Sequence, residues 1–156
     1  MQRPRPPTPS TRRAYSQTCY DLAQHTIRIG ERLDPWPFRS RALVLISACN
    51  PSGRRQPEGI NRRAMAHLRA HLSVFDPQVG YGHWRGWGES FLAVALPMDR
   101  ARVLGRRFGQ NALVYVVKGR KARLIWLYDR RKLPHGREKR TPATLIDTGR
   151  SIEADR

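Results

Sequence analysis

Four polar side chains, far apart in the sequence, are the strongest candidates for chemistry in this chain. Glu89 lies two residues before a strongly strand-forming run at 91–96, where a carboxylate needs a partner. Side-chain amides that could donate a hydrogen bond to this carboxylate are those of Asn50, Asn61 and Gln110. A carboxylate among amides either acts as a general acid or base on a polar substrate, or forms a structural network in which each group satisfies the others.

Asn61 is the most informative of the amides, because its spacing places it on an apolar helix face. It shares that face with Ala64, Leu68 and Leu72, and a polar residue on a buried face requires hydrogen-bonding partners. It also lies near the helix N-terminus, where unpaired N–H groups and the helix dipole favour an anion. That anion is either Glu89 or a phosphate or carboxylate of a ligand.

Basic residues dominate the charge. Thirty Lys and Arg against twelve Asp and Glu give a formal charge of +18, which favours polyanions such as nucleic acid. Only four of the thirty are Lys, so a general compositional bias toward Arg explains the charge equally well. The arginines expected near the four polar residues are Arg54, Arg55, Arg62, Arg63, Arg106 and Arg107.

Metal and nucleophile chemistry find little support. His67 and His71 stand four apart on the expected helix, as zinc ligands do, but Leu68 takes the place of the usual Glu and no third ligand is evident. Cys49 lacks an assignable base, and with Cys19 it makes neither a disulfide framework nor a metal motif. We expect no metal and no cofactor.

The elements that must position these side chains follow from hydrophobic periodicity. An N-terminal extension of short extended pieces, expected at 14–20 and 26–29, precedes them. In chain order we predict a central strand at 41–48, a helix at 58–75, strands at 78–84 and 91–96, a helix starting at 97–99 with Asp99 as N-cap, and a hairpin of strands 112–118 and 121–128.

This order is β-α-β-β-α-β with an added C-terminal hairpin strand, the connectivity of the α+β, ferredoxin-like split βαβ fold. In that fold the strands starting near Phe91 and Ala112 flank the strand at 41–48. One edge of the sheet then collects the site residues Asn50, Asn61, Glu89, Ser90 and Gln110.

The ends of the chain differ from the middle. Residues 1–13 are rich in Pro and Arg, and 134–156 are polar, so we expect a disordered arm, one domain at 14–133 and a disordered tail. We find no secretory signal and no apolar run near the roughly 18 residues of a spanning helix. A cytoplasmic protein without a membrane partner is the expectation.

Five short motifs resemble, in order, those of a bacterial family called domain of unknown function 3293. They cover about residues 15–118 and are Thr26–Gly30, Ile46–Pro51, Asn61 with Leu68 and Leu72, Trp87–Phe91, and Phe108–Ala112. Ser47 stands where Thr is expected, and the hydroxyl is retained. The resemblance implies a single domain and no established reaction.

Arg85-Gly86-Trp87-Gly88 also resembles the start of an RNA-recognition-motif signature. That module stacks bases on aromatic residues of its central strands. Here Glu89 takes an aromatic position, and the run at 43–46 offers no aromatic residue, so the likeness fails.

The leading hypothesis is therefore a non-catalytic binding module for a polyanion, either nucleic acid or an anionic, phosphorylated small molecule. One alternative is an enzyme on a polar or phosphorylated substrate, with Glu89 as general acid or base. Another is a protein-interaction adaptor that uses the edge of the hairpin at 112–128. Ligand identity, pathway and oligomeric state are not encoded in any recognisable motif.

Overall fold

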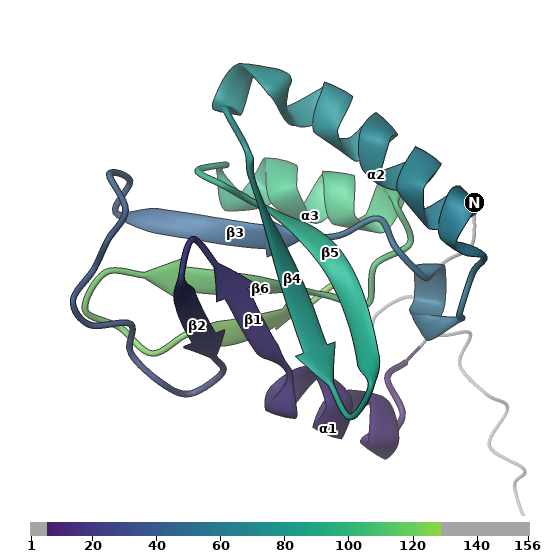
Figure 1. Cartoon of the computed structure of the whole chain (residues 1–156), viewed down its shortest axis with the longest axis horizontal. Helices are drawn as coiled ribbons and strands as arrows, with labels where there is room; N and C mark the ends of the chain where they lie inside the picture. The colour runs from purple at the N-terminus through teal and green to yellow at the C-terminus, as the bar shows by residue number, and fades with distance from the viewer. Residues whose placement is uncertain (1–5, 129–156) are drawn as a thin grey trace, which may run out of the picture.

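The computed structural model describes residues 6–128 as an α+β domain with a curled, antiparallel seven-stranded sheet and three α-helices (Figure 1). The strand order is β2-β1-β4-β5-β3-β6-β7. The elements are α1 (Pro9–Gln17), β1 (Cys19–Leu22), β2 (His25–Arg28), β3 (Ala42–Ile46), α2 (Glu58–Leu72), β4 (Gln78–Trp84), β5 (Trp87–Val94), α3 (Met98–Arg107), β6 (Ala112–Val117) and β7 (Arg123–Trp126). Within the described residues, no helix is long and apolar enough to cross a membrane.

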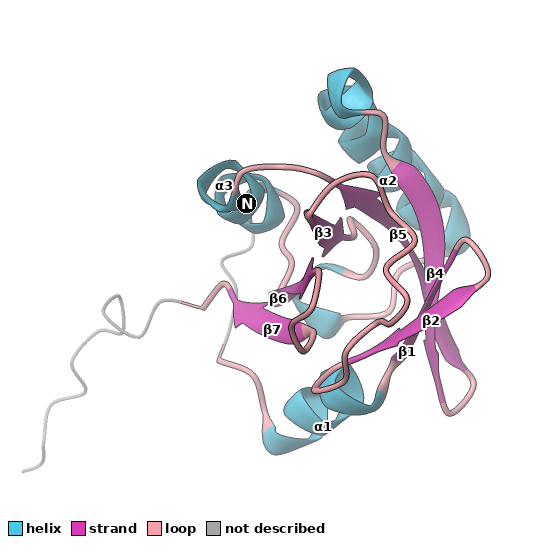
Figure 2. Cartoon of the chain, turned by 90° about the vertical axis from the view of Figure 1, so that its left-hand side faces the viewer, coloured by secondary structure: helices cyan, strands magenta, loops and turns pink. Residues whose placement is uncertain are grey.

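Strand β3 is central and buried on both faces, as its continuous apolar run predicted. It pairs with β5 on one side and β6 on the other, which confirms the expected neighbours. Val44 and Ile46 belong to one core with Leu68 and Leu72 of α2. Helices α2 and α3 lie over the same face of the sheet (Figure 2). The apolar period of α2 therefore fixes its position over the sheet.

The opposite face of the sheet forms the inside of the curl. Leu43 and Leu45 of β3 join a second core there, with Phe91 of β5. The curl brings the two ends of the sheet together, since an isolated bridge joins Ile29 to Ala122. The hairpin edge expected to bind a protein partner is thus partly occupied by the chain's own Ile29. The role of β7 as an interaction edge stays a prediction.

The N-terminal segment differs from the prediction. Residues 14–17, expected as extended chain, belong to helix α1, and so do residues 9–13 of the expected disordered arm. Thr8 caps the helix by accepting a hydrogen bond from the Thr11 N–H at 3.2 Å, and Pro9 follows at the first helical position, where proline is favoured. The predicted boundary at residue 14 is therefore too late. The predicted tail at 134–156 lies outside the described residues.

The start of β5 is a second correction. Only Arg85 and Gly86 form the turn after β4, with φ values of 47° and 72°, as a two-residue hairpin turn requires. The strand thus begins at Trp87 and not at Phe91, and Glu89 lies inside the sheet, paired with Gly82.

Two smaller predictions were also wrong. Pro97, not Asp99, occupies the N-cap position of α3, and Asp99 lies in the first helical turn, where its charge complements the helix dipole. In the last hairpin the regular pairing ends at Tyr115 and Arg123, so the connection is longer than the two residues expected.

Candidate functional site

Asn50 is the centre of the polar cluster and lies four residues after the end of β3. Its backbone is left-handed (φ 47°, ψ 60°), a conformation that Asn tolerates better than most residues. The short 3-10 turn Pro51–Gly53 comes next and leads the chain away from the sheet. This geometry turns the buried Asn50 side chain toward the start of α2 and toward β5.

Asn50 and Asn61 are joined by a reciprocal pair of hydrogen bonds. The Asn50 backbone N–H donates to Asn61 Oδ1 at 2.9 Å, and Asn61 Nδ2 donates to Asn50 Oδ1 at 3.0 Å. The Gln56 N–H donates to the same Asn50 oxygen at 2.8 Å. These bonds tie the loop before α2 to the first turn of the helix, and Asn61 occupies the partly buried position that its spacing predicted.

Glu89 completes the cluster from β5. Asn50 Nδ2 donates to Glu89 Oε1 at 2.7 Å, a short distance typical of a bond to a charged acceptor. Burial raises the pKa of Glu89, and the hydrogen bonds from Asn50 and Trp87 only partly offset this effect. The structure therefore brings together three of the predicted residues, Asn50, Asn61 and Glu89.

Gln110 lies at the same edge but bonds to the backbone. Its Nε2 donates to the Cys49 carbonyl at 3.0 Å and to the Phe108 carbonyl at 3.4 Å. Gln110 thus connects the end of α3 to the end of β3, next to the cluster. The carbonyl of Ser90, the fifth predicted residue, accepts a hydrogen bond from the Ser47 hydroxyl at 2.8 Å.

A cleft of about 520 Å³, which we call the edge cleft, opens between the start of α2 and the β4–β5 hairpin. Of the arginines expected here, Arg55 and Arg62 line it, together with the cluster. The Arg55 guanidinium lies over the Trp87 ring, 5.0 Å from its centre. Tyr81, which is 51% exposed, contributes a second aromatic ring.

The other predicted arginines do not line the edge cleft. These are Arg54, Arg63, Arg106 and Arg107, which are exposed, and Arg106 Nε donates to the Leu127 carbonyl at 3.3 Å. The expected ring of six arginines is therefore reduced, at this cleft, to two.

A second hollow, the α1 cavity, has a volume of about 380 Å³ and lies inside the curl of the sheet beneath α1. Trp87, Glu89 and Ser90 line both this cavity and the edge cleft. The α1 cavity was not predicted from the sequence because helix α1, which covers it, was not predicted. The signal that was present is Thr8 followed by Pro9, a cap and first-turn pair.

Cys49 is buried next to the cluster. Burial raises the pKa of its thiol, which disfavours the thiolate that a nucleophile needs. His67 and His71, the pair considered for metal, are exposed on α2. His71 lies edge-on to Phe108, with ring centres 6.0 Å apart.

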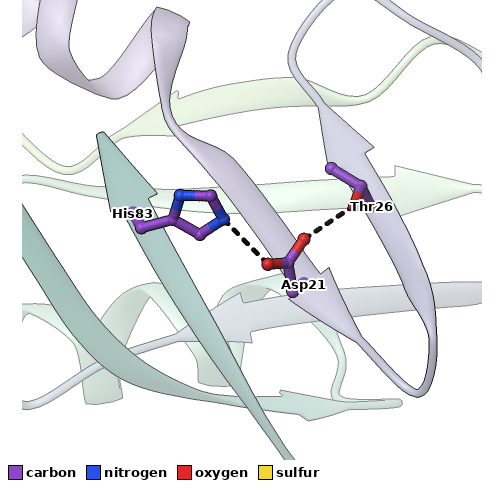
Figure 3. Close-up of polar contacts among 3 residues, drawn as sticks. All are labelled: Asp21, Thr26 and His83. Atoms are coloured by element: carbon purple, nitrogen blue, oxygen red, sulfur yellow. Dashed lines mark hydrogen bonds and ion pairs between the residues drawn. The ribbon is translucent and has the colours of Figure 1, made fainter. Parts of the chain in front are cut away.

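One polar group that the sequence did not reveal lies on the outer face of the sheet (Figure 3). His83 Nε2 of β4 contacts Asp21 Oδ2 of β1 at 2.8 Å, and Thr26 of β2 donates to Asp21 Oδ1 at 2.7 Å. The hydrogen bond from Thr26, and then that with His83, lower the pKa of Asp21. Because the hydroxyl meets Asp21 and not His83, this group is a link between three strands and not a nucleophile–base relay.

The fold and the cluster define a small α+β domain with an amide–carboxylate site at one end of its central strands. Residues 46–113 match the family model described as protein of unknown function (DUF3293). This confirms the resemblance for the segment from the end of β3 to the start of β6, which contains Asn50, Asn61, Glu89 and Gln110. Comparisons with curated proteins and with solved structures gave no match.

Proposed function

We propose that this chain is a basic binding module whose edge cleft holds a polyanion, and that its ligand is single-stranded nucleic acid. The observation that carries the proposal is the combination in one cleft of two arginines, Arg55 and Arg62, with two aromatic rings, Trp87 and Tyr81. Proteins that bind single strands combine basic grooves for phosphates with aromatic platforms for bases.

The arrangement of the arginines supports phosphate binding. Arg55 is already oriented by the Trp87 ring, so less side-chain freedom is lost when it binds. Helix α2 begins at Glu58, and its N-cap residue, Pro57, provides no side-chain cap, which leaves its first N–H groups facing this end of the helix. These features favour an anion at the mouth of the cleft.

Two carboxylates line the same cleft and oppose an anion. Glu58 is exposed, and its charge is screened by solvent. The Glu89 carboxylate is engaged by the Asn50 amide, which donates to its Oε1 at 2.7 Å. The net charge of +18 attracts a polyanion over a longer range than these local charges.

We also propose that β3, α2, β4, β5, α3 and β6 form a ferredoxin-like unit. The strand order β4-β5-β3-β6 within the sheet supports this assignment. The β1–β2 hairpin extends the unit on one side and β7 extends it on the other.

The test is fluorescence anisotropy with labelled dodecamers of dT and rU, at a series of salt concentrations. We expect the affinity to fall steeply with salt, and the slope of log K against log salt to decrease by about 1 for each of Arg55→Ala and Arg62→Ala. Arg69→Ala is the matched control, because Arg69 is an exposed arginine of α2 that does not line the cleft.

A weak salt dependence, or cleft variants that act no more strongly than Arg69→Ala, would refute the proposal. If a phosphorylated mononucleotide binds as tightly as the dodecamers, the ligand of the cleft is a small phosphorylated molecule and not a nucleic acid strand.

The second candidate is an enzyme in which Glu89 is the general acid or base. The observation in its favour is a buried carboxylate of raised pKa that lines a cleft, an arrangement common at catalytic sites. Glu89→Gln separates the two roles. In an enzyme it abolishes turnover of a phosphorylated model substrate and leaves the melting temperature nearly unchanged, whereas in a purely structural cluster the main loss is in melting temperature.

A further inference from the structure

The α1 cavity shares Trp87, Glu89 and Ser90 with the edge cleft, but its remaining walls are different. Helix α1 forms one side through residues that include Ala14 and Tyr15, and the inner face of the sheet forms the other through Leu45, Phe91 and Val114. Its volume of about 380 Å³ falls in the usual range for small-molecule pockets. Most of its surface is apolar.

The hollow has a clear origin in the sequence. Gly82 stands directly opposite Glu89 in the β4–β5 pairing and contributes no side chain there, and Thr18 and Tyr20 lie over it, 3.3 Å and 3.4 Å from where a Cβ would be. Ala112 of β6 and Ala14 of α1 are also small. Helix α1 buries none of its residues completely, which shows that it covers the sheet without close packing.

The polar groups of the cavity are gathered at one end. Ser47 and Gln110 donate their hydrogen bonds to backbone carbonyls, at 2.8 Å and 3.0 Å. Glu89, the carboxylate of the lining, accepts hydrogen bonds from Asn50 at Oε1 and from Trp87. A carboxylate has about four acceptor positions, so Glu89 keeps about two of them to spare.

Tyr15 closes the cavity near the same carboxylate. Burial, and then the charge of Glu89, raise the pKa of the Tyr15 hydroxyl, so this group remains a protonated, neutral phenol. The Tyr20 hydroxyl donates to the Tyr15 carbonyl at 3.2 Å and links β1 to α1. Tyr20 and Phe91 meet edge to face with ring centres 6.0 Å apart, and both line the cavity.

We infer that the α1 cavity is a second binding site, which takes a small, mostly apolar aromatic molecule that donates one N–H or O–H hydrogen bond to Glu89. The aromatic and aliphatic walls favour a flat apolar body. The single carboxylate at one end selects a donor and rejects an anion, in contrast to the ligand proposed for the edge cleft. The two sites share Glu89 but differ in every other requirement.

The test uses indole and benzofuran, which have nearly the same shape but differ in one respect. Indole carries an N–H donor where benzofuran carries an oxygen acceptor. In titrations followed by backbone amide chemical shifts, we expect indole to bind and benzofuran to bind at least about tenfold more weakly, because a hydrogen bond to a charged acceptor is lost.

Ala14→Phe places a ring in the cavity from α1 and should abolish indole binding. Ser16→Phe is the matched control, since Ser16 is exposed on the same helix and is expected to leave binding unchanged. Melting curves show whether Ala14→Phe folds; if it does not, Thr11→Leu narrows the cavity from the same helix and replaces it.

Three results would overturn the inference: no binding of indole, equal binding of benzofuran, or indole binding that survives a folded cavity-filling variant. Arg62→Ala distinguishes this site from the edge cleft. It should weaken oligonucleotide binding and leave the indole affinity within about twofold of the original, because Arg62 does not line the α1 cavity.

Discussion

Replacement of Asn61 by Ala tests whether the cluster holds the edge of the sheet together. The change removes the acceptor of the buried Asn50 N–H, which is 2.9 Å from Asn61 Oδ1. It also removes one of the two donors that Asn50 Oδ1 meets, the other being the Gln56 N–H. The helix itself is expected to continue, because Ala is a better helix former than Asn.

The magnitude follows from these bonds. A buried N–H without a partner costs about 1–3 kcal/mol, and loss of the side-chain bond adds about 0.5–1.5 kcal/mol. The higher helix propensity of Ala offsets about 0.5 kcal/mol of this loss. Asn61 is only partly buried, so water reaches part of the site and the lower half of the range applies. We therefore expect Asn61→Ala to lower the free energy of unfolding by about 2 kcal/mol.

The assay is urea unfolding at pH 7, followed by tryptophan fluorescence and by far-ultraviolet circular dichroism. Arg63→Ala is the control, because Arg63 is exposed two residues further along the same helix and its replacement should change stability by less than about 0.5 kcal/mol. Surface substitutions change the free energy of unfolding by about 0.5 kcal/mol at most. If the free energies of unfolding of Asn61→Ala and Arg63→Ala differ by less than about this amount, the cluster does not hold the edge of the sheet together.

Three further predictions concern packing and pH. Gly80→Ala should lower the free energy of unfolding, measured with urea, by about 1–3 kcal/mol. The added methyl group would overlap the Phe91 ring and lie 2.6 Å from the Asp21 carbonyl oxygen. The control is Gly59→Ala, which should not lower the free energy of unfolding, because a methyl group there has nothing within 4 Å. Because burial raises the folded-state pKa of Glu89 above its ordinary 4.5, the protein should lose stability as pH rises through that folded pKa, and Glu89→Gln should remove this loss in a pH series of unfolding midpoints. Hydrogen bonding lowers the folded-state pKa of Asp21 below 3.8, so its small contribution to stability should be present above pH 3.8 and disappear as pH falls through the folded pKa. If Asp21→Asn loses stability at acid pH in the same way as the original protein, this prediction is wrong.

The central part of the fold was predictable because its hydrophobic patterns are long and consistent. The apolar run of β3 and the three- and four-residue spacing on α2 each allow only one placement of their buried residues. Once β5 and β6 flank β3, the positions of Asn50, Asn61 and Glu89 follow from connectivity. The cluster was thus predicted from topology before any distance was known.

The features that were missed depend on local signals that composition obscures, or on contacts between distant strands. Helix α1 lies in a segment whose Pro and Arg content indicates disorder, and one capping Thr with one Pro outweighs that composition. The contact between Asp21 and His83 requires β1 to pair with β4, two strands separated in sequence by β2, β3 and α2. Periodicity within each strand carries no information about such a pairing.

The surroundings of Glu89 explain how strand β5 accommodates a carboxylate. The residue opposite Glu89 is Gly82, which has no side chain to meet the carboxylate, and Asn50, held by Asn61, supplies an amide donor to one oxygen. A glutamine would occupy the same volume, but its amide group would place N–H donors where the carboxylate offers only acceptors. The distinguishing property of Glu89 is therefore acceptance of hydrogen bonds, from the Asn50 amide and, in the site proposed for the α1 cavity, from a donor of the ligand. A structural cluster needs the first of these bonds, and a binding site needs the second.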